Sequence, residues 1–350
     1  MRLASVEAIP YALPFREPYV TARGTLTRRE MVLLRLRAEE GLEGLGEAVP
    51  LSLRGGATLA RVTRELEALG ELAGEAPAGL EAGAAAAELS APARCAVETA
   101  LWDLRARAGG ATTQPAAVEC NATLVAGEPA AVAAEARRWQ EAGFTTFKLK
   151  LGAGQDVAQV RAVREALGEE ARIRVDANAA WSLAAARETL AAIEPFGIEL
   201  VEQPVERIEE AAELAAATGI PLAGDESIVT AADARRAAEL GAFAVTGIKL
   251  SKVGGQATAL AIAEELAAYA SSALDGPVGI AAGARLAAAL DARAAAGLQP
   301  RIAHGLATQR LFAATIASVQ CEVRDGWLHP PPGPGLGVEI DEDALAAHRI

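Results

Sequence analysis

The sequence has few cysteines, and the three present, Cys95, Cys120 and Cys321, are far apart. An odd number of thiols at this spacing provides neither a disulfide framework nor the closely spaced pairs of a zinc site. We therefore expect three packed thiols in a reducing compartment, which favours a cytoplasmic location.

Long apolar runs are also absent. No stretch approaches the roughly 18 residues that a membrane-spanning helix needs. The N-terminal segment MRLASVEAIPYALPF lacks the continuous apolar stretch and cleavage site of a signal peptide. Both absences argue against a membrane partner.

Positive charge is in short supply. Lys and Arg number 33 against 46 Asp and Glu, so the formal net charge is −13 and the pI is about 4.9. An acidic surface repels phosphate backbones, so we expect no nucleic-acid partner. Hydrophobic residues make up 51% and charged residues 23% of the 350, which is typical of a soluble globular protein with one large barrel or two smaller domains.

The N-terminal part, residues 1–116, is predicted to be an α+β capping domain. Residues 31–36 alternate like a strand, and a second strand ends at Glu47 after a turn. Two helical stretches follow, and the second, APARCAVETALWDLRARAGG, ends at Gly109 and Gly110.

From residue 117 short apolar strands alternate with alanine-rich helices. The expected strands are VECNATL, TTFKLKLG, IRVDANA, IELVEQPV, PLAGDES, AVTGIKLS, YASSALD and RIAHGLAT. Eight such units predict an α/β fold, a closed parallel (β/α) barrel of modified TIM type over residues 117–320. The tail, residues 321–350, is too short to fold alone, so we expect it to return to the capping domain.

Charged residues recur where the predicted barrel strands end, which is where barrel enzymes keep their active sites. In chain order they are Lys148, Lys150, Asp176, Asn178, Glu202, Asp225, Glu226 and Lys249. Intervals of about 23 to 26 residues, one strand–helix unit, separate successive strand ends from the second to the sixth. We therefore expect these side chains at one height around the barrel mouth.

Strand alternation gives the direction of these side chains. In FKLKL the apolar residues share one face, and Lys148 and Lys150 share the other. Helices cover the outside of a parallel barrel, so both lysines are expected to point into the lumen. The same reasoning places Asp176 and Asn178 inside. Two buried ammonium groups need carboxylates to offset them.

Asp176, Glu202 and Asp225 can supply those carboxylates, but three acids at one point repel one another. A hard divalent cation resolves this, and Mg²⁺, with Mn²⁺ as a substitute, prefers oxygen ligands. When a substrate carboxylate binds this metal, the positive charge makes the α-proton of the substrate more acidic. The same charge stabilises the enolate that forms.

The base that removes this proton has to be neutral near pH 7. Lys150 suits the role, because Lys148, Lys249 and the metal all disfavour its charged form and so lower its pKa. Lys148, Lys150 and Lys249 are therefore the candidate catalytic residues.

At these positions the sequence resembles the enolase superfamily, specifically its muconate-lactonizing subgroup. The motifs that carry the resemblance are KxK at Lys148, DxN at Asp176, EQP at Glu202, GDES at Gly224 and IKLSKVGG at Ile248. The resemblance extends over essentially the whole chain. No His stands at the seventh strand end, where the mandelate racemase subgroup carries its base.

The resemblance implies that Asp176, Glu202 and Asp225 bind the metal and that Lys150 and Lys249 flank the substrate on opposite faces. It also implies a small carboxylate substrate closed in by the capping domain. The closing loops would lie near residues 17–27 and 51–56, and homo-oligomers are common in the family.

Within the subgroup the chain looks most like the o-succinylbenzoate synthases of menaquinone biosynthesis. The matching stretches are NATL, SSALDGPVGIAAG, HGLAT and LPFREPYVTARGTLTRRE, whereas GEAVPLSLRGG departs from the pattern. By this resemblance Lys150 removes the α-proton and helps the hydroxyl leave, a syn dehydration that aromatises a cyclohexadiene. Lys249 stays protonated and stabilises the enolate.

Four alternatives stay open. An N-succinylamino acid racemase would use the same two lysines as a symmetric acid–base pair, and a muconate-type cycloisomerase is also compatible. A dipeptide epimerase is disfavoured, because RIAHGLAT lacks the Asp-x-Asp that binds a substrate ammonium in such enzymes. A barrel that only binds a metal would lack one of the key residues, and none is missing.

Other polar residues lie near the predicted strand ends. Ser271, Ser272, Asn178 and Gly305 are expected to bind substrate, although the two serines also suit a turn. Glu226 and Asp275 are expected to support the residues that contact the substrate. We expect Lys252 outside the lumen, since its strand parity is opposite to that of Lys249. His304 is expected to be a satisfied barrel histidine, and Trp181 is close enough to Asn178 to line the site.

Overall fold

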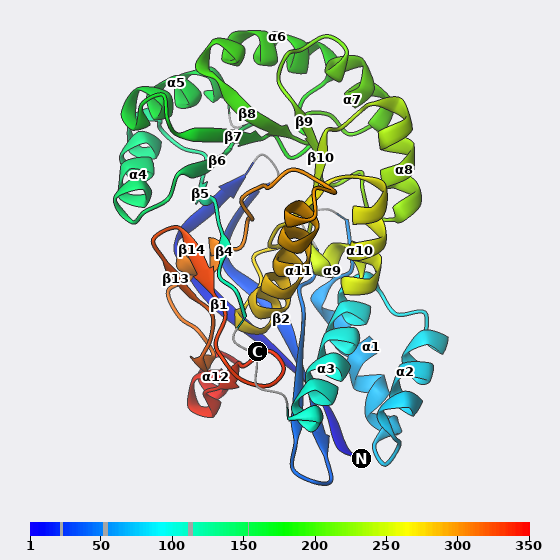
Figure 1. Cartoon of the computed structure of the whole chain (residues 1–350). Coiled ribbons are helices and arrows are strands. Elements are labelled where there is room, and N and C mark those ends of the chain that lie inside the picture. Colours follow the sequence, from blue (N-terminus) through cyan, green and yellow to red (C-terminus); the bar gives the residue numbers. More distant parts are fainter. Residues whose placement is uncertain (22–23, 52–54, 111–114, 153) are drawn as a thin grey trace.

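The computed structural model describes residues 1–21, 24–51, 55–110, 115–152 and 154–350. An antiparallel sheet with helices occupies one end of the molecule, and a curled parallel sheet surrounded by helices occupies the other (Figure 1). Residues 22–23 and 52–54 of the two expected closing loops lie outside the described residues.

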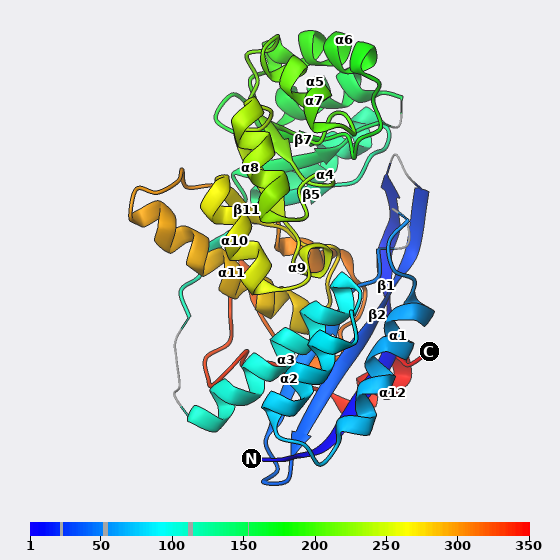
Figure 2. The same cartoon turned by 90° about the vertical axis from the view of Figure 1, so that its right-hand side faces the viewer.

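The N-terminal end is α+β, as predicted. Its strands are β1 (Leu3–Thr21), β2 (Gly24–Ala38) and β3 (Glu43–Ala48), which pair antiparallel in that order. Its helices are α1 (Leu59–Ala68), the 3-10 turn η2 (Leu69–Leu72), α2 (Pro77–Ala86) and α3 (Ala91–Gly109). The chain leaves α3 through Gly110 in a left-handed conformation (φ 66°), a common end for a helix. The long β1–β2 hairpin extends toward the parallel sheet (Figure 2).

Seven parallel strands form the second layer. In sheet order they are β11 (Ala268–Ala270), β10 (Val245–Ile248), β9 (Leu222–Gly224), β8 (Ile198–Glu202), β7 (Arg172–Asp176), β6 (Thr146–Lys150) and β5 (Ala122–Leu124). The helices between and after them are α4 (Pro129–Glu141), α5 (Asp156–Leu167), α6 (Leu183–Ile193), η3 (Glu194–Phe196), α7 (Ile208–Ala215), α8 (Ala231–Leu240), α9 (Leu250–Val253), α10 (Gln256–Glu265) and α11 (Pro277–Ala295). This succession is the predicted strand–helix alternation.

The eighth predicted strand is reduced to two bridges, so the expectation of eight regular strands is wrong. His304 bridges Cys120 next to β5, and Gly305 bridges Ser271 next to β11, both in parallel. The segment thereby joins the two edges of the sheet. It pairs no further because the chain turns at once into η4 (Ala307–Leu311), whose residue Thr308 faces the cavity described below.

The C-terminal tail adds small strands and one helix. They are β13 (Glu322–Arg324), β14 (Trp327–His329), β15 (Glu339–Ile340) and α12 (Glu342–His348). The strand β14 also pairs with β4 (Val118–Glu119), and β15 pairs with β12 (Ala317–Val319), which precedes the tail. The helix α12 lies beside the capping sheet (Figure 2), where the buried Arg35 binds Glu342 at 2.6 Å. The Ile350 amide donates to the Pro10 carbonyl at 3.2 Å. The boundaries at residues 116 and 320 stay predictions.

One apolar cluster runs through both layers. It contains Tyr11 and Met31 of the capping sheet together with Phe147 and Val278 of the parallel-sheet layer. The three cysteines are buried and free. Among the described helices, none has the length and apolarity needed to span a bilayer.

Candidate active site

A cavity of about 960 Å³ lies between the capping sheet and the C-terminal ends of the parallel strands. Tyr19, Leu26 and Arg29 of the capping hairpin line one side. The other side is lined by residues of the strand ends and the loops that follow them. The site therefore forms where the two layers meet, as ligand sites between domains commonly do.

All four lysines of the chain line this cavity. Lys148 and Lys150 come from β6, and Lys249 follows β10. Lys252 lines it as well, so the expectation that it lies outside the lumen is wrong. The strand ends at Ile248 and the short helix α9 begins, so residues three apart share a face and strand alternation no longer applies.

The carboxylates lie behind these lysines. Asp176 and Glu202 end β7 and β8 at neighbouring register positions, and both are buried. The Lys148 Nζ lies 2.6 Å from each Glu202 carboxylate oxygen and 2.9 Å from Asp176 Oδ2. The Lys150 Nζ lies 2.6 Å from the same Asp176 oxygen. Both lysines thus point inward, as strand alternation predicts.

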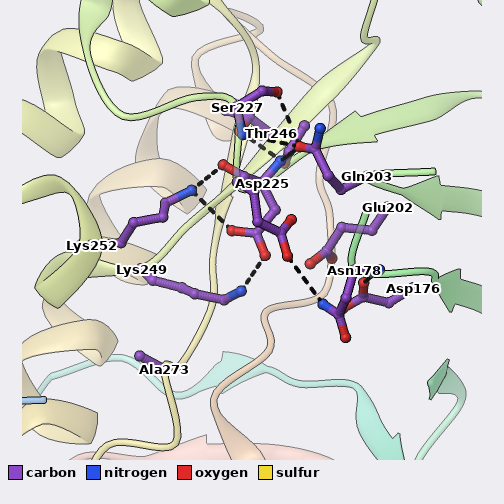
Figure 3. A network of polar contacts seen from close by, with 12 residues as sticks. Asp176, Asn178, Glu202, Gln203, Asp225, Ser227, Thr246, Lys249, Lys252 and Ala273 are labelled. Atoms are coloured by element: carbon purple, nitrogen blue, oxygen red, sulfur yellow. Dashed lines mark hydrogen bonds and ion pairs between the residues drawn. The ribbon is translucent and has the colours of Figure 1, made fainter. Parts of the chain in front are cut away.

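Asp225 follows β9 and is completely buried. Its carboxylate binds Lys249 and also Lys252, the latter at 2.9 Å, with these two lysines on one side of it and Glu202 on the other (Figure 3). Its backbone amide donates to the Gln203 side chain at 2.8 Å. Gln203 therefore ties the end of β8 to the loop that carries Asp225.

The charges of these groups shift one another's pKa values. Burial alone would raise the pKa of Asp176, but the ammonium groups of Lys148 and Lys150 outweigh it and lower that pKa. Burial likewise would lower the pKa of Lys148, yet the charges of Asp176 and Glu202 raise it well above its ordinary value. Lys148 therefore stays charged and is poorly suited to accept a proton.

Tyr269 of β11 contacts the site but is not among the residues predicted from the sequence. Its hydroxyl donates to Glu202 inside the barrel. Its neighbour in the sheet is Gly247, where an added Cβ would lie 3.0 Å from the hydroxyl oxygen, so glycine leaves room for the ring. The signal was present in the sequence, because Tyr269 shares its strand parity with the predicted site residue Ser271.

The predicted substrate-binding residues gather around the cavity. Asn178, Ser271, Ser272 and Gly305 all line it. Asn178 accepts from Lys150 at 3.2 Å. These four residues thus share one cavity, and their roles stay predictions.

Of the two predicted supporting residues, Glu226 lies on the cavity wall and Asp275 contacts that wall through its neighbours. Glu226 lines the cavity and accepts from the Asn178 amide at 3.3 Å. Asp275 accepts from the Ser272 hydroxyl and from the Ala273 amide, each at 2.7 Å. Asp275 therefore acts on the cavity wall through Ser272.

His304 and Trp181 have structural partners. The His304 Nδ1 accepts from the Ala270 amide at 3.0 Å, which agrees with a satisfied barrel histidine. The Trp181 indole donates to Asp156 at 3.1 Å.

The side chains that line the cavity carry more positive than negative charge, and Asp176, Glu202 and Asp225 behind the lysines offset most of the excess. Besides the lysines, Arg29 and Arg61 of the capping layer line the cavity, against the two carboxylates of Glu206 and Glu226. Arg29 was also missed from the sequence, although it shares the strand parity of Met31, which packs toward the parallel sheet. A wall with this charge favours an anionic ligand.

The donor set suits a hard cation. Asp176, Glu202 and Asp225 offer only oxygen atoms, and the pKa of Asp176 responds to the charge of Asp225. Within the described ranges no three His, Cys, Asp or Glu side chains are already gathered as a metal cluster. Lysine ammonium groups lie against these carboxylates instead. They neutralise part of the negative charge that a bound Mg²⁺ ion would neutralise.

Comparison with known families decides the affiliation. Residues 4–114 match the N-terminal domain of mandelate racemase and muconate lactonizing enzyme, and residues 131–344 match the enolase C-terminal domain-like family. The chain belongs to the enolase superfamily. The curled parallel sheet with its α+β cap is the fold of this superfamily.

Relatives in the superfamily have several activities. Muconate cycloisomerase 1 of Pseudomonas putida is 31% identical over 97% of this chain and 96% of that protein. The o-succinylbenzoate synthase of Thermobifida fusca is 40% identical, over 48% of this chain and 55% of that protein. A dipeptide epimerase of Enterococcus faecalis, solved with Mg and L-Leu-L-Tyr, superposes with a TM-score of 0.86 at 27% identity and covers 97% of this chain and 100% of that one. The protein is thus an enzyme of the lyase or racemase and cycloisomerase type.

Proposed function

We propose that this enolase-superfamily enzyme removes a proton next to a carboxylate of a small dicarboxylic acid, as an o-succinylbenzoate synthase does. The observation that supports this most is the placement of Lys150 and Lys249 on one cavity. Three strands separate β6 from β10 in the curled sheet, so the two ammonium groups approach a ligand from opposite walls.

In this mechanism Lys150 accepts the α-proton in its neutral form. The hydroxyl on the neighbouring carbon then leaves from the same face with a proton from Lys150, so that water is released and the ring becomes aromatic. Lys249 donates hydrogen bonds to the enolate from the opposite wall. Lys148 stays charged and holds Asp176 and Glu202 in place.

Asp176, Glu202 and Asp225 would hold a magnesium ion, for which manganese can substitute. When bound, the ion supplies positive charge beside the substrate carboxylate. The presence of Mg in the dipeptide epimerase structure supports this assignment for a chain of the same fold.

The charge of the cavity supports a substrate with two carboxylates. Among the described residues that line it, four lysines and two arginines outnumber Glu206 and Glu226, and these six basic groups still exceed the five carboxylates that result when Asp176, Glu202 and Asp225 behind the lysines are included. A dipeptide carries an ammonium group, and residues 301–308 have no Asp-x-Asp to bind it. The partial match to the synthase of Thermobifida fusca is a further, independent support.

The test is an assay of purified enzyme with Mg²⁺ and the cyclohexadiene acid, followed by the change in ultraviolet absorbance on aromatisation. We expect turnover that falls roughly 100- to 10,000-fold in Lys150→Ala. Arg235→Ala, which removes an exposed ion pair with Glu265, is the matched control and should keep wild-type activity.

N-succinylamino acids and dipeptides are assayed under the same conditions as the cyclohexadiene acid. Racemisation of an N-succinylamino acid at a higher kcat/KM than dehydration would assign the enzyme to the racemases instead. Turnover of dipeptides alone would contradict the dicarboxylate assignment.

A further inference from the structure

A carboxylate of the capping domain binds the start of a barrel helix. Glu47, in β3, is buried, and its Oε1 accepts from the Gly276 amide at 2.6 Å. Its Oε2 accepts from the Tyr11 hydroxyl at 2.8 Å. Gly276 is the N-cap residue of α11, where unpaired amides and the helix dipole attract an acceptor.

The fit at this contact is close. An added Cβ at Gly276 would lie 2.2 Å from the Tyr11 hydroxyl oxygen and 2.8 Å from Glu47 Oε2. At Gly279 it would lie 2.7 Å from Glu47 Oε1. Only glycine at both positions lets the carboxylate reach the helix, so the contact is specific to this pair of elements.

The helix start is joined directly to the cavity wall. Ser271, Ser272 and Leu274 line the cavity, and Asp275 holds them through the Ser272 hydroxyl. Leu274 adopts a left-handed backbone conformation (φ 65°), which a leucine rarely adopts. Such a conformation persists only where the surrounding contacts hold it.

We propose that Glu47 is a positioning residue: from the capping domain it fixes the start of α11 and thereby holds residues 271–275 against the substrate. The effect of Glu47 on substrate binding rests on the proposed function, whereas its effect on the start of α11 does not. Docking of the cap and order of the substrate-facing loop are therefore coupled through one side chain.

The charges around Glu47 make this coupling depend on pH. Burial and the nearby Asp275 raise the pKa of Glu47 to about 7, and burial raises that of Asp275. Among the described residues, Tyr11 of β1, Arg29 of β2 and Cys95 of α3 also face this pair. Above neutral pH two carboxylates are charged side by side, and their repulsion loosens the loop.

Hydrogen–deuterium exchange of the full-length enzyme tests the structural link without any substrate. After correction for intrinsic rates, protection of residues 271–280 should fall about tenfold between pH 6 and pH 8.5. Glu47→Gln keeps an acceptor for Gly276 and should abolish this fall. An equal pH-dependent fall in Glu47→Gln would overturn the proposal.

Tyr11→Phe provides a second, milder variant. The Tyr11 hydrogen bond lowers the pKa of Glu47, so its loss should move the midpoint of the protection change to higher pH. An unchanged midpoint would count against the coupling.

Kinetics then test the link to the reaction. In the wild type KM should rise several-fold above pH 7 while kcat changes less than twofold, and in Glu47→Gln KM should be independent of pH over this range. If the exchange result is as expected but the KM of the wild type does not change with pH, only the proposed role in substrate binding is refuted. Absence of turnover on every acid would refute the proposed function and leave the exchange result standing.

Discussion

Four lysines share one cavity, but their partners give them different tasks. Lys148 bridges Glu202 and Asp176, and Lys150 binds Asp176 and Asn178. The charges of its two partners raise the pKa of Lys148. Two carboxylates thus hold Lys148 in its charged form, which suits a structural role.

Removing Lys148 should therefore destabilise the protein. Lys148→Ala leaves the buried Glu202 and Asp176 short of a counter-charge, which costs about 3–5 kcal/mol of unfolding free energy. Lys252→Ala is the matched control, since Asp225 keeps Lys249, and its loss should be smaller. Urea unfolding with EDTA present measures both, and equal losses would contradict the assigned roles.

The residues on regular strands could be predicted from the sequence, because alternation fixes their direction once the outer face is known. Lys148, Lys150 and Asp176 follow this rule. Lys252 does not, because a helix begins between it and the strand. Arg29 was missed since its place in the site depends on the capping sheet reaching the barrel mouth, a tertiary contact that no local pattern reveals.

Among the elements, β3 and α3 pack unusually closely. An added Cβ at Gly46 would lie 1.9 Å from the Ala96 carbonyl oxygen, and at Gly44 2.3 Å from that of Ala100. This approach places Glu47, the next residue, within reach of α11. The eighth barrel strand could not be placed correctly at this scale, because the pairing of His304 and Gly305 with both sheet edges depends on how the sheet curls.

Gly46→Ala should therefore be costly. The new methyl group would force β3 and α3 apart, with an expected loss of about 2–4 kcal/mol of unfolding free energy. Gly109→Ala, in the last turn of α3 with open space around it, is the control and should be neutral or stabilising by up to about 1 kcal/mol. Thermal unfolding of the two variants checks this, and a neutral Gly46→Ala would show that the packing can relax.

For the whole molecule, the two layers share an apolar core and the buried contact between Glu47 and Gly276. The pKa of Glu47 is raised from 4.5 to about 7, so the folded state binds its proton more tightly than the unfolded chain does. This contribution to stability is complete below pH 4.5 and is lost as the pH rises toward 7.

The wild type should thus lose stability relative to Glu47→Gln across this window, by at most about 1.4 kcal/mol per pH unit. Chemical denaturation of both proteins at pH 5, 6, 7 and 8 measures the difference. Parallel stability curves would show that Glu47 ionises in the folded protein at its ordinary pKa.

The central claim is that Lys150 removes the α-proton of a substrate that lies between it and Lys249, on opposite walls of the cavity. The most direct test is deuterium incorporation at the α-carbon of the acid with the highest kcat/KM, in D₂O with Mg²⁺. Proton NMR measures the loss of the α-proton signal. The wild type should exchange this proton, and Lys150→Ala should slow the exchange by roughly 100- to 10,000-fold. Exchange at the wild-type rate in Lys150→Ala would contradict the account.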